Sequence, residues 1–301
     1  MATSDEMTYS APQQVYRPGS GGGNLPASRR TLNHPGSAAD AAGAYRLPGR
    51  LKIWVRLRLE ELRFRTREIV RRHLRKLVEI ALSDLDLMNA LQEIGSSAAF
   101  ERKYLHDAAD FKGRHQLYKH LLSQIPRENG GLFLEFGVYK ADSINRFAEL
   151  RRDVHWYGFD SFEGLPEEWT LGARKGAFSI DGMLPPVRNN VTLIKGFFED
   201  TLPAFVAKHR DAKASFIHID CDLYSSTRTV LDHLEDMLQP GCIIIFDEYF
   251  NYAGWAEQEY KAFSEFATRT GRAFEYIGYV RTGGQVAVRL GQIVSRADKA
   301  A

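Results

Sequence analysis

With 301 residues, of which 44% are hydrophobic, the chain is long enough to bury one full core and to carry an appendage. Its formal net charge of +2 gives no reason to expect nucleic acid as a partner. No apolar run approaches the ~20 residues of a membrane-spanning helix, and the N-terminus lacks the pattern of a secretion signal. Cys221 and Cys242 lie in apolar runs without metal-ligand or redox spacing, so we expect both to be reduced and buried in a cytoplasmic protein.

Four segments are predicted from composition. Residues 1–48 are rich in Ser, Ala, Gly and Pro and have too little apolar surface to offset the entropy of ordering, which predicts a disordered tail. Residues 49–110 form a basic helical segment, residues 111–292 an α/β domain, and residues 293–301 a C-terminal tail.

The basic segment has an apolar stripe at three- and four-residue spacing, which indicates an amphipathic helix over residues 50–94. Two interpretations stay open. The helix packs on its own domain or on a second subunit of a homo-oligomer, or residues 50–82 contact an anionic membrane or glycolipid. The second interpretation would place the protein peripherally at the inner membrane surface.

Short, nearly continuous apolar runs alternate with helical patterns after residue 111. The expected strands are Leu132–Gly137, Trp156–Asp160, Val191–Ile194, Ala214–Ile219 and Cys242–Phe246. Two further strands, Phe274–Val280 and Gln285–Leu290, flank a hairpin-like turn. A doubly wound, mostly parallel, seven-stranded Rossmann-like sheet with an antiparallel C-terminal strand is therefore predicted. The expected helices are Asp142–Leu150, one from about Thr201 to His209 that Asp200 or Thr201 caps, Ser226–Leu238 and Glu257–Thr270.

The first two strands end in residues that suit a nucleotide-like ligand. Gly137 lets the backbone approach such a ligand, and the helix after it, which contains Ser143, presents its N-terminus. Asp160 ends the next strand, where dinucleotide-binding folds place an acid for the ribose hydroxyls. With Glu135 upstream we favour this role for Asp160 over that of a helix cap.

Two aromatic residues stand near the same strand ends. Phe197 and Phe162 can flank an adenine from its two sides, and ordinary core packing explains each of them equally well.

Four carboxylates follow two neighbouring strands. Asp220 and Asp222 come after one strand, and Asp247 and Glu248 after the next. Acids gathered at one sheet edge repel each other unless a cation compensates them, and an all-oxygen site suits Mg²⁺. Helix capping explains one of these pairs but not both.

The segment from Leu132 to Leu290 resembles the macrocin O-methyltransferase (TylF-type) family of class I S-adenosylmethionine-dependent methyltransferases. The resemblance rests on five blocks, Glu135–Val138, Phe159–Pro166, Glu199–Pro203, His218–Thr227 and Phe246–Tyr249. It implies the methyltransferase variant of the fold, S-adenosylmethionine as donor, Mg²⁺, and a hydroxyl of a sugar or glycosylated small molecule as acceptor.

The same resemblance implies that Asp220, Asp247 and Glu248 hold the metal and that Asp222 is the general base. His218 is an alternative base, although its place within a strand favours a core histidine. Three aromatic residues are candidates for the acceptor pocket: Tyr224, Tyr249 and Trp255.

The chain departs from the family at Ala141-Asp142, where relatives often have two glycines before the serine. A carboxylate at this position either repels the cofactor's carboxylate or orients its ammonium group. Two other functions stay open: a metal-dependent glycosyltransferase or phosphatase that uses Asp220 and Asp222, and a non-catalytic binding protein on the same fold.

Overall fold

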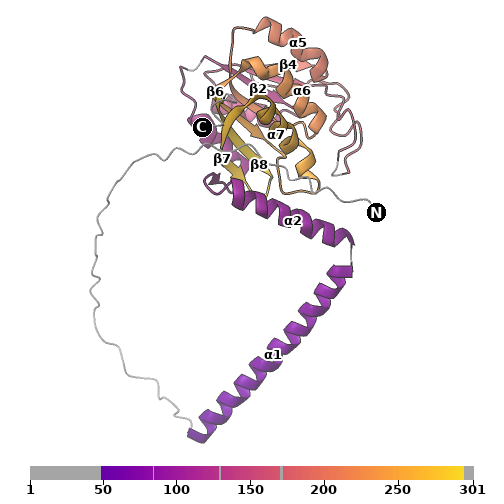
Figure 1. Ribbon diagram of the computed structural model, residues 1–301, viewed down its shortest axis with the longest axis vertical. Coiled ribbons are helices and arrows are strands. Elements are labelled where there is room, and N and C mark those ends of the chain that lie inside the picture. Colours follow the sequence, from indigo (N-terminus) through magenta and orange to yellow (C-terminus); the bar gives the residue numbers. More distant parts are fainter. Residues whose placement is uncertain (1–48, 84, 129, 170–171, 295–301) are drawn as a thin grey trace, which may run out of the picture. The chain divides into compact units, whose positions relative to one another are not determined.

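The computed structural model describes residues 49–83, 85–128, 130–169 and 172–294 (Figure 1). The predicted tail over residues 1–48 and most of the predicted C-terminal tail lie outside the described residues. The described chain divides into two compact units, which comprise residues 49–88 and residues 89–294.

The first unit is helical. Helix α1 (Gly49–Ser83) has 35 residues, and α2 (Leu85–Tyr104) begins in this unit and ends in the second. The sequence predicted one helical stretch over residues 50–94, and the described helices extend it by ten residues. Among the described residues, no helix is both long enough and apolar enough to cross a membrane.

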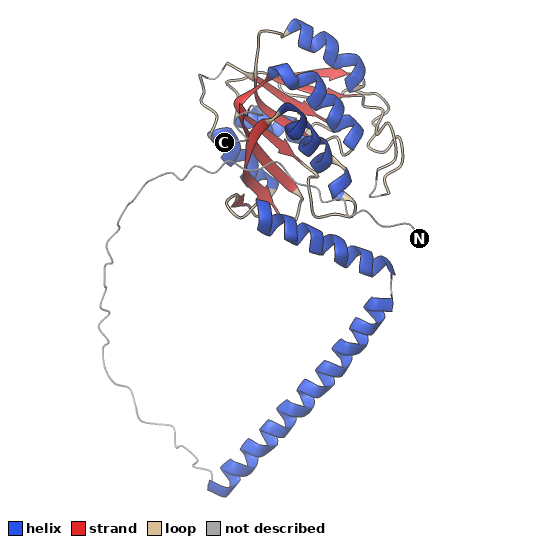
Figure 2. Cartoon of the chain, viewed as in Figure 1, coloured by secondary structure: helices blue, strands red, loops and turns tan. Residues whose placement is uncertain are grey.

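The second unit contains a mixed sheet, shown in red in Figure 2, with strand order β1-β7-β8-β6-β5-β2-β3-β4. Its strands are β1 (Ala109–Asp110), β2 (Leu132–Phe136), β3 (Trp156–Asp160), β4 (Val191–Lys195), β5 (Ala214–Ile219), β6 (Leu238–Phe246), β7 (Arg272–Val280) and β8 (Gln285–Ile293). Strands β2 to β6 pair in parallel, and β8 is antiparallel to both β6 and β7. The predicted fold class is confirmed. The described sheet has one strand more than the predicted seven, because the two-residue β1 pairs with β7.

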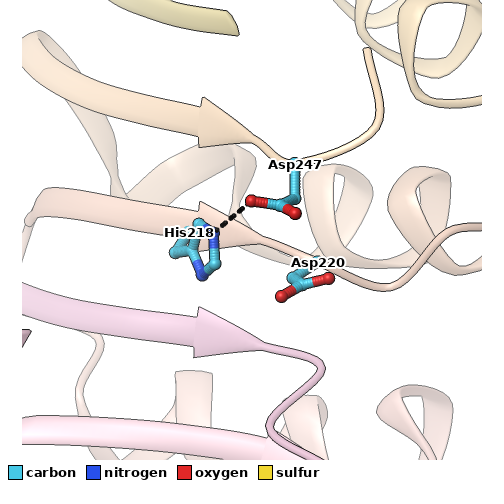
Figure 3. Close-up of side chains that lie close together, drawn as sticks. All are labelled: His218, Asp220 and Asp247. Carbon is cyan, nitrogen blue, oxygen red and sulfur yellow. Dashed lines mark ion pairs between the residues drawn. The ribbon is translucent and has the colours of Figure 1, made fainter. Parts of the chain in front are cut away.

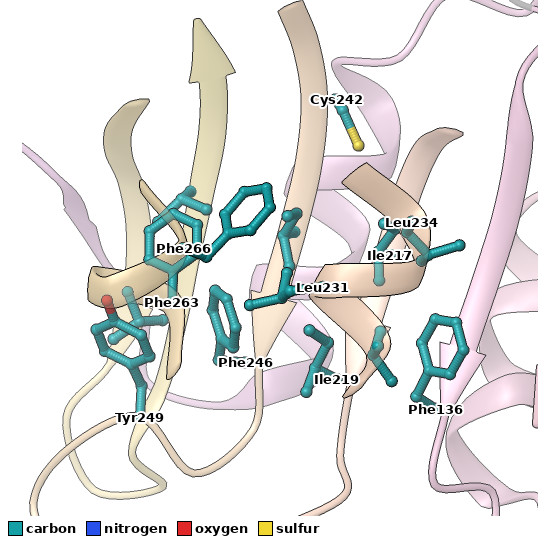
Figure 4. Close-up of a cluster of buried hydrophobic side chains, with 14 of the residues drawn as sticks. Phe136, Ile217, Ile219, Leu231, Leu234, Cys242, Phe246, Tyr249, Phe263 and Phe266 are labelled. Carbon is teal, nitrogen blue, oxygen red and sulfur yellow. The ribbon is translucent and has the colours of Figure 1, made fainter. Parts of the chain in front are cut away.

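Helices cover both faces of this sheet. They are α3 (Arg114–Ser123), α4 (Asp142–Leu150), α5 (Phe198–Lys208), α6 (Tyr224–Leu234) and α7 (Glu259–Thr270), with 3₁₀ turns η1 (Glu235–Met237) and η2 (Trp255–Glu257). One core lies between the sheet and α5, α6 and α7, where Phe246, Leu231 and Phe263 pack together (Figure 4). The other core joins the opposite face to α3 and α4. Because the central strands are buried on both faces, their sequences are nearly continuous apolar runs.

Helix α5 corrects a prediction. It begins at Phe198, after the N-cap residue Phe197, so Asp200 and Thr201 lie inside the helix and do not cap it. The Thr201 hydroxyl instead donates a hydrogen bond to the Phe197 carbonyl, 3.0 Å away. Asp200 lies in the first turn, where an acidic side chain interacts favourably with the helix dipole.

The order of strands reverses between β2 and β5, and there the backbone is tightly packed. Gly137 has a φ of +88°, and a Cβ added to it would lie 1.7 Å from the carbonyl oxygen of Asp220. Only glycine fits between these two strand ends. This close approach brings the turn after β2 next to the acids after β5.

Gly137→Ala should therefore destabilise the protein more than backbone strain alone explains. Gly241 is a matched control, because its φ is +89° and an added Cβ meets nothing within 4 Å. We expect about 1–2 kcal/mol for Gly241→Ala, because its Cβ is strained at a positive φ, and a further ~1–3 kcal/mol for Gly137→Ala because of overpacking. Denaturant unfolding of both variants measures the difference; equal losses would contradict the steric explanation.

Candidate active site

A pocket of about 290 Å³ opens at the carboxyl ends of β2, β3, β5 and β6. Its lining includes Gly137 after β2, Asp160 at the end of β3, Asp222 after β5 and Glu248 after β6. This is the edge at which ligands bind in open α/β sheets. The predicted donor-binding turn and the predicted acidic group therefore share one pocket.

Asp160 organises the donor side of the pocket. One of its carboxylate oxygens accepts hydrogen bonds from the backbone N–H groups of Val138 and Tyr139, each 2.8 Å away. The other accepts the N–H of Phe162 at 2.7 Å. The carboxylate thus fixes the turn after β2 and the turn after its own strand while it faces the pocket. The sequence suggested either a ribose ligand or a cap, and the geometry accommodates both roles.

Three of the six residues predicted to bind the cofactor line the pocket, namely Gly137, Asp160 and Phe197. The other three lie outside its lining. Glu135 is fully buried and accepts a hydrogen bond from the Ser143 hydroxyl at 2.6 Å, and Phe162 is buried in the core on the side of α3 and α4. In this arrangement Phe162 cannot flank an adenine, because the core covers it completely.

The departure at Ala141-Asp142 is visible in the backbone. Ala141 precedes α4 with a φ of 65°, in the left-handed region that glycine favours. Asp142 is exposed and does not line the pocket.

The four acids after β5 and β6 come together as predicted. They form two overlapping groups, Asp220 with Asp222 and Glu248, and Asp220 with His218 and Asp247, each with possible ligand atoms within 4.8 Å of one another. Burial, together with the charge of neighbouring acids, raises the pKa of Asp220 and Glu248 well above the ordinary values. The same two causes raise the pKa of Asp222 to about 7. One buried oxygen of Glu248 has no hydrogen-bond partner.

Asp247 differs from the other acids because donors surround it. Its two oxygens accept hydrogen bonds from the Tyr118 hydroxyl at 3.0 Å and the Gln285 amide at 3.2 Å, and His218 lies 3.5 Å away (Figure 3). Burial opposes the charged form of Asp247, yet the bonds from His218 and Gln285 and the charge of Arg114 lower its pKa.

His218 is fully buried between two acids. Its Nδ1 lies 3.8 Å from Glu135 and its Nε2 3.5 Å from Asp247. Burial favours the neutral ring, but the interactions with the neighbouring acids Asp247 and Glu135 raise its pKa to about 10. These two acids therefore favour the protonated form of the imidazole. His218 does not line the pocket.

Asp222 is held in a strained backbone conformation. Its φ is 63°, and the N–H of Leu223 bonds to the carbonyl of Cys221 at 2.6 Å, which closes a γ-turn around Asp222. For a non-glycine residue such a conformation costs of order 1–3 kcal/mol and persists where the surroundings impose it, often at functional sites. The turn places a mostly buried Asp222 on the pocket wall.

The aromatic residues proposed for the acceptor side lie elsewhere, which corrects that expectation. Tyr249 and Trp255 are buried in the core around Phe100, and the Tyr224 hydroxyl donates to Glu265 on the surface. The rings of Tyr249 and Trp255 are buried between the sheet and the helices, and that of Tyr224 lies near the surface.

The loop between β3 and β4 supplies the opposite wall of the pocket. Its lining residues are Leu165, Pro166, Trp169 and Phe178, and Arg114 adds a cation from α3. Ser225 on α6 donates a hydrogen bond to Glu167 at 2.5 Å, which fastens this loop. In the sequence, only the family-like block Phe159–Pro166 pointed to this wall, because the loop has no periodic pattern.

Glu259 was also missed. It is fully buried at the start of α7, and its carboxylate accepts the backbone N–H of Glu248 at 3.1 Å. Burial and the charges of nearby acids raise its pKa well above the ordinary value. The sequence predicted only a helix over Glu257–Thr270 here and no role for Glu259. Its carboxylate fixes the backbone at Glu248 through this hydrogen bond.

Comparisons with known proteins agree with this geometry. A family model described as a methyltransferase domain matches residues 134–249, which include both the turn after β2 and the four acids. A curated protein of Streptomyces olivaceus, named 8-demethyl-8-(2,3-dimethoxy-alpha-L-rhamnosyl)-tetracenomycin-C 4'-O-methyltransferase, is 33% identical over 40% of this chain. The chain spans about half, 53%, of the length of that curated relative.

Among solved structures, the chain is similar to the calicheamicin methyltransferase CalS11, with 20% identity and a TM-score of 0.47 over 58% of this chain and 76% of that one. For the O-methyltransferase NovP the identity is 19% and the TM-score 0.44, over 60% of this chain and 80% of that one. The methyltransferase-domain model thus matches part of the predicted domain of residues 111–292, and the curated relative is an O-methyltransferase. The finer assignment to the macrocin type stays a prediction.

Asp160→Ala should weaken binding of S-adenosylmethionine by roughly 1.5–3 kcal/mol, the range for a lost charge-assisted hydrogen bond. It should also lower thermal stability, because three backbone N–H groups lose their acceptor. Asp142→Ala is the control, since this exposed carboxylate lies outside the pocket lining; its affinity should change less than about twofold. Titration calorimetry measures both variants. Wild-type affinity in Asp160→Ala would remove Asp160 from the donor site.

Proposed function

We propose that the protein transfers the methyl group of S-adenosylmethionine to a hydroxyl of a sugar or glycosylated small molecule, assisted by a divalent cation such as Mg²⁺. One observation carries the proposal: within the matched methyltransferase domain, the donor-type turn and the four acids line or adjoin the same pocket. The acceptor class is supported by the name of the curated relative, which describes O-methylation of a rhamnosyl group.

The donor side of the pocket is assigned to Gly137, Asp160 and Phe197. Gly137 allows the donor to approach the backbone, and the N-terminus of α4 behind it favours a carboxylate. Asp160 accepts from a ribose hydroxyl with the one lone pair that its three backbone hydrogen bonds leave available, on the oxygen that also accepts the N–H of Phe162. Phe197 provides an apolar surface for the adenine. Glu135 and Ser143 support the turn from beneath.

The acids fit a hard cation. Their oxygens lie within 4.8 Å of one another in overlapping groups, and the buried Glu248 oxygen without a partner needs a positive charge. Asp220, Asp247 and Glu248 would hold the ion. When bound, a divalent cation lowers the pKa of a hydroxyl that it contacts and fixes its position. Tyr118 and Gln285 orient Asp247 and leave it further lone pairs.

Asp222 is assigned the role of the general base that accepts the proton of the acceptor hydroxyl. As the acceptor oxygen attacks the donor's methyl carbon and the carbon–sulfur bond breaks, the hydroxyl proton passes to the Asp222 carboxylate. A pKa of about 7 suits a group that must be partly ionised near neutral pH and still hold a proton. The γ-turn fixes this side chain on the wall next to Glu248.

Metal dependence has a direct test. Chelator should abolish transfer of labelled methyl from S-adenosylmethionine to a panel of rhamnosides, nucleotide sugars and cell extract, and excess Mg²⁺ should restore it. Calorimetry in chelator should still show donor binding, because the assigned donor contacts contain no acid of the metal group. Full turnover in chelator would leave the four acids without a metal role.

Substitutions should separate the base from the metal ligands. Asp222→Asn should keep donor and metal affinity and lose roughly 10²–10⁴-fold in turnover, the usual range for a removed general base. Asp220→Asn and Glu248→Gln should instead weaken metal binding, with partial rescue by excess Mg²⁺. Asp236→Asn, an exposed acid after α6, serves as the control and should match the wild type.

Two outcomes would overturn these roles. Rescue of Asp222→Asn by added Mg²⁺ would make Asp222 a metal ligand, which the grouping with Asp220 and Glu248 allows geometrically. Donor binding without methyl transfer to any acceptor would favour a non-catalytic binding protein. Binding of nucleotide sugars without S-adenosylmethionine binding would favour the glycosyltransferase.

A further inference from the structure

Helix α1 carries an apolar stripe along one side, independent of the pocket. Its members over the part with described side chains are Leu59, Leu62, Thr66, Ile69, Val70, His73, Leu77 and Ile80. At about 100° per residue they fall within roughly 50° of a common direction. The six aliphatic members are between 50% and 61% exposed, which leaves a large apolar surface for an occupant.

The acids lie on the side of α1 away from this stripe, whereas the cations lie all around the rest of the helix. Residues 58–80 contain eight Arg or Lys and four Glu, which gives a net charge of +4. Arg58 and Lys76 lie about 70° from the centre of the stripe on one side, and Arg63 lies about 70° from it on the other. All four acids lie about 130° or more away. The acids are Glu60, Glu61, Glu68 and Glu79. Three apolar residues lie outside the stripe: Leu74 about 90° from its centre, and Phe64 and Val78 on the far side.

From this arrangement we propose that α1 lies on the surface of an anionic phospholipid bilayer, with the stripe among the acyl chains. The flanking cations reach the lipid phosphates, since long basic side chains extend their charge away from an apolar surface. The acids point to water. No described helix can cross a membrane, which agrees with an in-plane position.

A second copy of the same helix is a poorer occupant. Paired helices that bury such a stripe place flanking residues of one copy beside those of the other, and stable pairs put opposite charges there. In α1 the near flanks carry Arg58, Arg63 and Lys76, so pairing would bring cations together. Two of the four acids pair along their own helix: Glu61 with Arg58 at 3.2 Å and with Arg65 at 2.8 Å, and Glu68 with Arg71 at 3.3 Å.

The test is sedimentation of the full-length protein with vesicles. We expect binding to vesicles of phosphatidylglycerol and phosphatidylcholine, little binding to phosphatidylcholine alone, and a loss of about tenfold or more when salt screens the charges. Leu62→Gln/Leu77→Gln should abolish sedimentation while circular dichroism shows that the helix is retained.

Matched charge variants test the orientation. Arg63→Gln/Lys76→Gln removes two flanking cations and should weaken binding about 10- to 30-fold, because each cation at an anionic surface contributes about fivefold. Arg71→Gln/Arg75→Gln removes the same charge from the far side, about 150–170° from the stripe centre, and should weaken binding less than about threefold.

Three results would overturn the proposal. In the first, the full-length protein stays in the supernatant with anionic vesicles. In the second, the flanking and far-side variants lose affinity equally, so that net charge alone explains binding. In the third, the wild type ignores vesicles and Leu62→Gln/Leu77→Gln converts a dimer to a monomer in sedimentation equilibrium, which would establish a homo-oligomer through α1.

Discussion

Compensation of buried carboxylates is the constraint on which the pocket depends. Asp220, Asp247 and Glu248 sit at two strand ends close enough for their charges to raise one another's pKa, except where donors intervene. His218 lies between Glu135 and Asp247, and these two acids raise the pKa of its imidazole. Under the proposed function, a cation bound beside the turn after β2 compensates the remaining acids.

Backbone geometry transmits this constraint to the donor side. Gly137 touches the Asp220 carbonyl so closely that the turn after β2 and the acids after β5 must move together. Two residues beyond Asp220, a γ-turn aims Asp222 at the same space. The roles proposed for Gly137 in donor binding and for Asp222 in proton removal therefore depend on one region of backbone. Because of this coupling, the side chains at the four strand ends keep fixed positions relative to one another.

The sequence predicts most of the sheet because strands buried on both faces are short apolar runs. For that reason Trp156–Asp160 and Ala214–Ile219 were predicted residue for residue. The acids were found because strand ends of a parallel sheet share one edge. Side-chain direction was harder to predict: Phe162 and Tyr249 are as apolar as any pocket wall, and only tertiary packing decides that they are core. The β3–β4 loop, which contains Trp169, has no periodic pattern from which its position could be predicted. Asp200 is a residue type that often caps helices, but α5 begins two residues earlier, at Phe198.

Net charge conceals how this chain distributes its ions. The whole sequence carries +2 while residues 58–80 carry +4, so everything else sums to 2 − 4 = −2. Electrostatic attraction decays within about 10 Å at 0.1 M salt, so a partner senses the local charge and not the total. The cations of α1 and the buried acids of the pocket are therefore two local concentrations of opposite charge within a nearly neutral chain. A net charge near zero therefore does not exclude regions of strong and opposite local charge in the same chain.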